Sequence, residues 1–168
     1  MRHIYEDDVM IIEYSIILVF WVLTAGMLAA FVPKNRRKEA IVIFLFKQIL
    51  TWFLGILSVE MALIEYPVRI FYKAIATSFT FEYFVYPAIC VVFVLHYPVN
   101  RGFTKRFLHY FYYCTAITLI EVVLEKYTNL IHYLHWSGVV TWISLAVSFF
   151  ISCLFYRWFF KDSVNRTA

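Results

Sequence analysis

Charged residues are scarce in this chain, at 15% of its 168 residues. Soluble domains carry about 25% charged and about 45–50% apolar residues. Here 63% of the residues are hydrophobic and the mean hydropathy is +0.74. A water-soluble globule of this composition would expose much of its apolar surface to water. The scarcity of charge therefore excludes an ordinary soluble domain and predicts a protein that lies in lipid.

Cysteines and catalytic motifs are also rare. Cys90, Cys114 and Cys153 all lie within apolar runs, so they indicate small packing residues and exclude a disulfide framework. The sequence has no GxSxG, GxGxxG or HExxH motif, and His132 and His135 alone are a weak signal for a metal site. No basic run alternates with exposed aromatic residues, which argues against a nucleic-acid partner. We therefore predict no enzyme, no cofactor and no metal.

Five apolar runs are each close to the length that crosses a bilayer, about 20 residues. They cover residues 10–32, 41–63, 79–97, 107–125 and 137–160. The first run could also be a cleaved signal peptide, but acidic residues precede it where a basic start is required. Segments 64–78 and 126–136 alternate polar and apolar residues at helical spacing, which predicts helices lying in the membrane interface. The sequence thus predicts one domain, residues 1–168: an all-α integral membrane bundle of five transmembrane helices with two short external interfacial helices.

Basic residues favour one side of this predicted bundle. Ten Lys and Arg residues belong to loops 33–40 and 98–106 and to the C-terminal end, against four on the other side. Because cytoplasmic loops of membrane proteins carry an excess of Lys and Arg, we predict that the N-terminus is outside and the C-terminus inside.

Carboxylates recur just beneath the predicted outer surface. At about 1.5 Å per helical residue, each of the first four spans places one carboxylate within about one turn of its outer end. These residues are Glu13, Glu60, Glu82 and Glu121, and Glu65 and Glu125 lie immediately above them.

Two interpretations of these acidic residues remain open. In the structural one the charges are paired: Glu65 precedes Arg69 in the favoured i, i+4 order, and Lys73 and Lys126 neutralise others. In the functional one an outer carboxylate cluster lines a polar cavity that opens to the outside and concentrates cations or protons. Carboxylates crowded in such a cavity raise one another's pKa. The cluster would consist of Glu13, Glu60, Glu82, Glu121 and Glu125.

Small and weakly polar residues form stripes on three spans. The clearest stripes are Thr51, Gly55 and Ser58 in the second span, Cys114 and Thr118 in the fourth, and Ser144, Ser148 and Ser152 in the fifth. Such stripes are typical of closely packed membrane helices, and the lining of a pathway is the alternative.

Three polar or helix-breaking features of the second and third spans give further predictions. The second span is polar on two sides, because Glu60 lies opposite its stripe, and we predict that it is central in the bundle. Lys47 is predicted to extend its side chain to the cytoplasmic interface. Pro87 predicts a helix kink and frees the carbonyl of Tyr83.

Three stretches of the chain carry a family resemblance: Glu65-Tyr66-Pro67-Val68-Arg69, residues 77–87, and Glu125-Lys126-Tyr127-Thr128. Through them most of the chain resembles a family of small multi-spanning membrane proteins of endospore-forming Gram-positive bacteria of the Bacillus and Clostridium type. The resemblance implies a bacterial plasma membrane, with that of a sporulating cell as one option. It brings no known activity and no catalytic residues.

These observations predict a multi-pass plasma-membrane protein without enzymatic chemistry, acting as a structural or accessory membrane component. The main alternative is a small cation or proton carrier or channel that uses the outer carboxylates, and an intramembrane enzyme comes third. The predicted partners are the lipid bilayer and either a second copy of the chain or another membrane protein. Transport would require a homo-oligomer, because five spans leave few ways to enclose a pathway in one chain.

Overall fold

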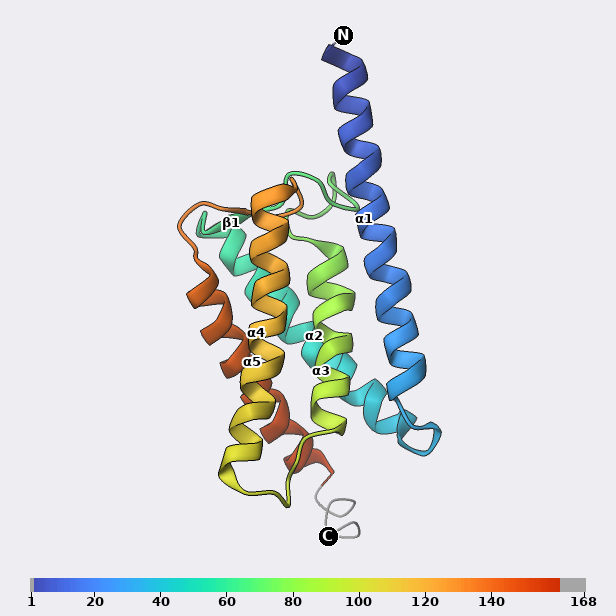
Figure 1. Cartoon of the computed structure of the whole chain (residues 1–168), viewed down its shortest axis with the longest axis vertical. Coiled ribbons are helices and arrows are strands. Elements are labelled where there is room, and N and C mark those ends of the chain that lie inside the picture. The colour runs from blue at the N-terminus through green and yellow to red at the C-terminus, as the bar shows by residue number, and fades with distance from the viewer. Residues whose placement is uncertain (1, 161–168) are drawn as a thin grey trace.

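The computed structural model describes residues 2–160, with side chains from Met10 onward. It is a bundle of five helices in which the short α3 lies among four longer ones (Figure 1). The helices are α1 (Arg2–Phe31), α2 (Arg37–Glu60), α3 (Tyr86–Leu95), α4 (Phe103–Tyr127) and α5 (Gly138–Phe159). A 3-10 turn η1 (Lys34–Arg36) precedes α2, a π-helical turn η2 (Phe81–Val85) precedes α3, and the strands are β1 (Ile64–Glu65) and β2 (His132–Tyr133).

Four of these helices are long and apolar enough to cross a membrane, and each overlaps a predicted span. They cover Met10–Phe31, Lys34–Glu60, Phe103–Tyr127 and Gly138–Phe159. The remaining predicted span, 79–97, is helical only from residue 79 to residue 95. At 1.5 Å per residue that is about 25 Å, less than the roughly 30 Å of a bilayer core. The all-helical bundle predicted from the sequence is confirmed.

The centre of the bundle is α3, and the prediction that the second span is central was wrong. Ala88, Cys90, Val91 and Phe93 on α3 have no exposed surface. The helix packs against α1, α2 and α5, and Phe93 stacks on Phe149 with ring centroids 4.4 Å apart. A helix that is apolar on all sides is stable only in an interior, whereas α2 presents exposed Ile49 and Phe53 on its outer side.

One end of the bundle is covered by a cap, which we define as residues 61–78 and 128–137. The two interfacial helices predicted there, 64–78 and 126–136, were wrong. Strand β1 pairs antiparallel with β2, Ile64 opposite Tyr133, and the rest of each segment forms turns, except that α4 continues to Tyr127. The two segments do not form helices because each satisfies backbone hydrogen bonds of the other. Leu134 N–H donates to Leu63 O at 3.0 Å, and Val68 N–H donates to Asn129 O at 3.0 Å.

The apolar side chains of the cap point into the bundle. Ile64, Leu130 and Ile131 are each at most 6% exposed. They form one hydrophobic cluster with Ile17 of α1 and Leu124 of α4. The cap therefore seals the end of the bundle from which the start of α1 projects (Figure 1).

Candidate functional site

A cavity of about 130 Å³ lies beneath the cap, bounded by α2, η2, α3, α4 and α5. Its walls combine acidic, hydroxyl and aromatic side chains from segments that are far apart in the sequence. The polar part of the lining includes Thr51, Ser58, Glu82, Glu121, Ser144 and Ser148.

Glu82 reaches the cavity because the helix around it is irregular. Pro87 has no N–H to donate, and the turn directly before it is π-helical, a form that is frequent at functional sites. Polar residues of α2 satisfy the backbone of this turn: Gln48 Nε2 donates to Tyr83 O at 2.8 Å, and Thr51 Oγ1 donates to Glu82 O at 2.6 Å. The stripe on α2 thus holds η2 in place, and the Tyr83 carbonyl is occupied by an amide of the protein.

The Glu82 carboxylate is 7% exposed and only half satisfied. Its Oε1 accepts a hydrogen bond from Tyr66 OH at 2.9 Å, and no described residue donates to its Oε2. Burial raises the pKa of Tyr66 well above its ordinary value, and the negative charges of Glu82 and Glu121 raise it further. Tyr66 therefore stays protonated and remains a donor, which leaves Oε2 of Glu82 as the acceptor without a partner.

Glu121, on α4, is fully engaged. Its Oε2 accepts from Tyr86 OH at 2.6 Å, and its Oε1 accepts from Tyr133 OH and Thr141 Oγ1, both at 2.7 Å. Trp136 Nε1 donates in turn to Thr141 Oγ1 at 2.8 Å. Burial, followed by the charge of Glu121, raises the pKa of Tyr133, so this cap residue also remains a donor. Three hydroxyl groups from three segments fix the Glu121 carboxylate.

Lys47 lies inside the bundle, and the prediction that it extends to the interface was wrong. Its side chain has no exposed surface. Its Nζ donates to Ser148 Oγ at 2.5 Å and lies 4.8 Å from the centroid of the Phe149 ring. Within residues 10–160 only Arg36 and Glu39 form a close ion pair, at 2.8 Å. The buried ammonium is therefore held by a hydroxyl and an aromatic face, without direct contact to a carboxylate.

The other acidic residues of the predicted outer cluster lie elsewhere. Glu13 is buried, and its Oε1 accepts from the backbone N–H of Asn129 at 2.8 Å, so it ties α1 to the cap. Glu60 and Glu65 are exposed, and Glu125 is half-buried on α4 outside the cavity lining. Of the five predicted members, only Glu82 and Glu121 line the cavity.

The predicted pairing partners of these acidic residues make other contacts. Arg69 does not pair with Glu65; its guanidinium donates to the backbone carbonyls of Tyr66, Tyr72 and Ile75. Lys73 and Lys126 are exposed and lie over the rings of Tyr72 and Tyr127. The ion pair predicted from the i, i+4 spacing of Glu65 and Arg69 was wrong because the segment between them is not helical.

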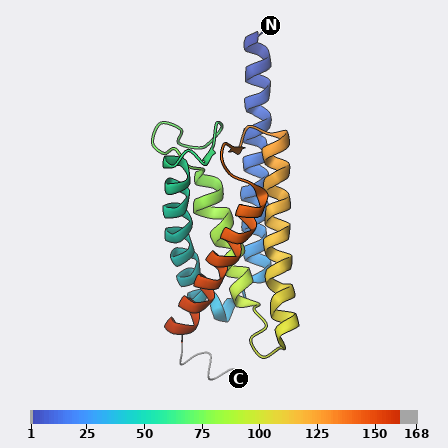
Figure 2. The same ribbon diagram turned by 90° about the vertical axis from the view of Figure 1, so that its left-hand side faces the viewer.

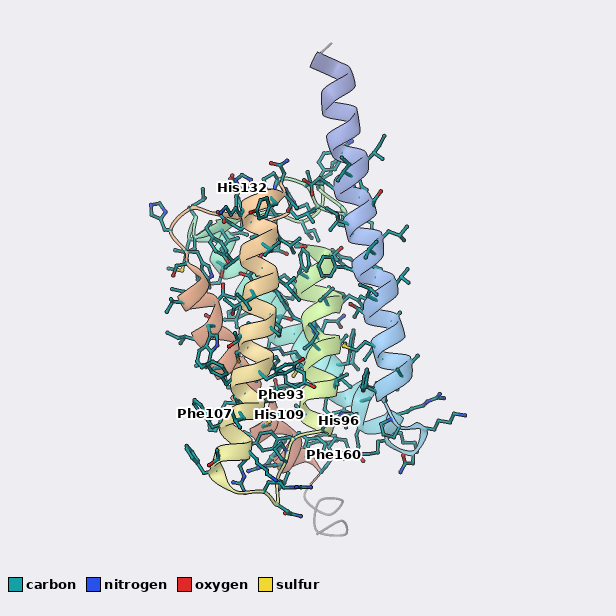
Figure 3. The ribbon with its side chains drawn as sticks, in the orientation of Figure 1. Phe93, His96, Phe107, His109, His132 and Phe160 are labelled. Carbon is teal, nitrogen blue, oxygen red and sulfur yellow. The ribbon has the colours of Figure 1, made fainter. Side chains whose placement is uncertain are left out.

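His132 and His135, a weak signal for a metal site in the sequence, are not part of any metal-binding group within the described residues. His132 lies at the cap, and His109 lies toward the opposite end of the bundle (Figure 3). His135 Nδ1 is 3.3 Å from Ala62 O. No group of three or more His, Cys, Asp or Glu side chains within the described residues is arranged to hold a metal ion.

Several residues of the site were missed by sequence reasoning: Lys47, Tyr66, Tyr86, Tyr133 and Trp136. Most are aromatic, and with Tyr at 13 and Phe at 18 positions nothing in the sequence distinguishes these tyrosines. The useful signal was the stripes on the second and fifth spans, since Thr51, Gly55, Ser58, Ser144 and Ser148 all line the cavity.

The cavity opens sideways, between α2 and α5. Both helices touch far from the cap, where Phe46 and Phe155 stack with centroids 3.8 Å apart, and they diverge toward the cap (Figure 2). Leu54 is 38% exposed at the opening, and Ser58, Trp136 and Ser144 are partly exposed there. The end of the bundle at which the sequence predicted an opening is instead covered by the cap.

Comparisons with protein-family models, with curated proteins and with solved structures each found no match for this chain, so its function has to be argued from the site itself.

Proposed function

We propose that this protein is an integral membrane protein that binds a small monovalent cation in exchange for a proton at the cavity of Glu82 and Glu121. This is the carrier alternative predicted from the sequence. The observation that supports it is the charge balance of the buried site. Two carboxylates line the cavity, and one ammonium group, that of Lys47, lies beside it on Ser148.

The two negative charges and one positive charge leave one negative charge uncompensated. An isolated carboxylate in a medium of low dielectric constant is so costly that the group takes up a proton or finds a partner. A proton and a bound monovalent cation satisfy the same requirement, and only one of them is needed at a time. Binding of the cation therefore releases the proton, which is the chemistry of an exchanger.

The two carboxylates have different roles in the proposed exchange. Glu121 accepts three hydroxyl hydrogen bonds, which hold its carboxylate in place. Glu82 keeps Oε2 without a donor, so this atom receives the proton or contacts the cation. Lys47 sets the net charge at one, which selects a monovalent cation over a divalent one.

For the cellular setting we propose a bacterial plasma membrane, the N-terminus outside and the C-terminus in the cytoplasm. The four long apolar helices are compatible with this placement, and the shorter α3 would lie within the bundle. The proposed partner is a second copy of the chain or another membrane protein.

The test is proton movement in liposomes that contain the purified protein and an entrapped pH indicator. A gradient of monovalent cation should drive counter-movement of protons, and Glu82→Gln should lower the rate at least about tenfold, since it removes the charge that cation and proton share. Glu60→Gln is the matched control, because Glu60 is exposed at the end of α2. Wild-type liposomes that pass neither protons nor cations would contradict the proposal and favour the structural or accessory role.

A further inference from the structure

We propose that the cation is a small organic ammonium ion with an apolar body, and that it reaches Glu82 from the lipid through the opening between α2 and α5. This inference rests on the proposed function and names the ligand class of the same site. It follows from three features of the cavity: its free acceptors, its walls and its opening.

The free acceptors are too few for a metal ion. Divalent cations such as Mg²⁺ and Ca²⁺ take about six to eight oxygen ligands. Both carboxylate oxygens of Glu121 and one of Glu82 are occupied by hydroxyl donors. The carboxylate oxygen that accepts from no described donor is Oε2 of Glu82, and neutral hydroxyl groups such as that of Ser58 line the cavity with it. One charged acceptor with a few hydroxyls suits an ammonium group, which forms up to three directional hydrogen bonds.

The walls suit the body of an organic cation. Tyr66, Tyr86 and Trp136 line the cavity together with the apolar Leu54 and Leu145. Aromatic faces attract organic cations, most strongly where water is excluded. The cavity volume of about 130 Å³ compares, on the same measure, with roughly 10–15 Å³ for a cavity that holds one water molecule. The cavity is therefore large enough for one compact organic cation and too apolar to favour a hydrated inorganic ion.

The opening between α2 and α5 is the route by which the ammonium ion enters the cavity. The cap blocks the direct path from its end of the bundle, because Tyr66 is 5% exposed and Ile131 is 1% exposed. The partly exposed lining residues Leu54 and Ser144 lie on α2 and α5, on the face that would meet lipid acyl chains. An amphipathic ammonium ion partitions into the membrane interface and can enter there, whereas an inorganic ion cannot cross the same apolar entrance cheaply.

The experiment measures binding to the full chain in detergent micelles by isothermal titration calorimetry, in two buffers that differ in protonation enthalpy. The probes are benzylammonium, its neutral analogue benzyl alcohol, and K⁺. Benzylammonium should bind at least about tenfold more tightly than benzyl alcohol, as expected when a charged hydrogen bond is lost, and should release about one proton. The Glu82→Gln variant, titrated in the same micelles, gives the heat that comes from partition of the probe into detergent. In this variant the proton release should be abolished.

A second pair of variants tests the route. Ser144→Trp narrows the opening and should slow or weaken benzylammonium binding, whereas Val147→Trp, on an exposed part of α5, should leave it unchanged. Equal effects of the two variants would contradict lateral entry.

The outcomes for the three probes separate this inference from the proposed function. Proton release on addition of K⁺ but not of benzylammonium would overturn the ligand class and leave the exchanger standing. Equal affinity for benzylammonium and benzyl alcohol would also overturn the ligand class. Proton release with neither cation would overturn both proposals.

Discussion

Gly55 of α2 lies directly against the carboxylate of Glu82. A Cβ atom built on Gly55 would lie 2.7 Å from Cδ of Glu82 and 2.9 Å from its Oε1. Real Cβ atoms essentially never come that close, so a side chain at position 55 would force the end of the Glu82 side chain to shift. The absence of a side chain at Gly55 thus leaves room for the Glu82 carboxylate at the place where it accepts from Tyr66.

Gly55→Ala should displace the Glu82 carboxylate and weaken cation binding. The displaced atoms end a flexible side chain, so the cost in folding stability should stay at the low end of overpacking, about 1 kcal/mol. Cation-driven proton movement in liposomes and thermal unfolding would be measured together. Gly26→Ala is the control, since a Cβ there meets nothing within 4 Å, and alanine should stabilise α1 by up to about 1 kcal/mol. Unchanged exchange in Gly55→Ala would contradict the placement of Glu82 in the site.

Lys47→Met should destabilise the protein strongly. Methionine keeps the length of the side chain but removes the buried ammonium that donates to Ser148 Oγ, and a buried polar group left without its partner costs about 1–3 kcal/mol. Adding Glu82→Gln should recover part of that loss, with a coupling of about 0.5–3 kcal/mol in a double-mutant cycle. The pair Lys47→Met with Glu60→Gln should show additive effects. Additive effects of Lys47→Met and Glu82→Gln on the free energy of unfolding would mean that the two buried charges do not balance each other.

Tyr66→Phe should weaken cation binding without unfolding the protein. The change removes the hydroxyl that donates to Glu82 Oε1 at 2.9 Å and leaves the carboxylate free to turn. Losing a hydrogen bond to a charged group costs about 1.5–3 kcal/mol, equivalent to about tenfold or more in affinity. Because the pKa of Tyr66 is raised by burial, its hydroxyl stays protonated and donates to Glu82 throughout the neutral range. Tyr72→Phe, on an exposed side chain, is the control.

Glu13→Ala should loosen the contact between α1 and the cap. The variant leaves the buried N–H of Asn129 without its acceptor at 2.8 Å, a loss of about 1–3 kcal/mol. Limited proteolysis should then cut within the cap faster than in the wild type. Ser15→Ala on exposed Ser15, which bonds within its own helix to Ile11 O, should behave like the wild type. Equal proteolysis of both variants would argue against an anchoring role for Glu13.

The orientation can be tested by reporter fusions and cysteine labelling. A reporter placed after Lys38 and one at the C-terminus should report cytoplasm, and a cysteine at position 7 should react with an impermeant reagent from outside, because basic residues favour the cytoplasmic side. The side chain of Asp7 and residues 161–168 lie outside the described part of the structure. Labelling from outside at position 37 would reverse the orientation.

Sequence by itself determined the class of fold and the positions of the long helices. Hydrophobic run length depends only on local composition, so the four long spans agree with α1, α2, α4 and α5. The stripe of Thr51, Gly55 and Ser58 likewise marked the face of α2 that lines the cavity.

Tertiary structure alone decided what surrounds each charge. Segments 64–78 and 126–136 have helical spacing in isolation, yet apart from residues 126–127 they form a short strand pair and turns, because each supplies hydrogen-bond partners to the other. Lys47 could reach an interface from a lone helix, but Ser148 of α5 and the Phe149 ring hold its ammonium inside. The pairing of Glu82 with Tyr66 and of Glu121 with Tyr86 joins residues 16 and 35 positions apart. Contacts of this kind depend on how helices pack, and no local pattern in the sequence records them.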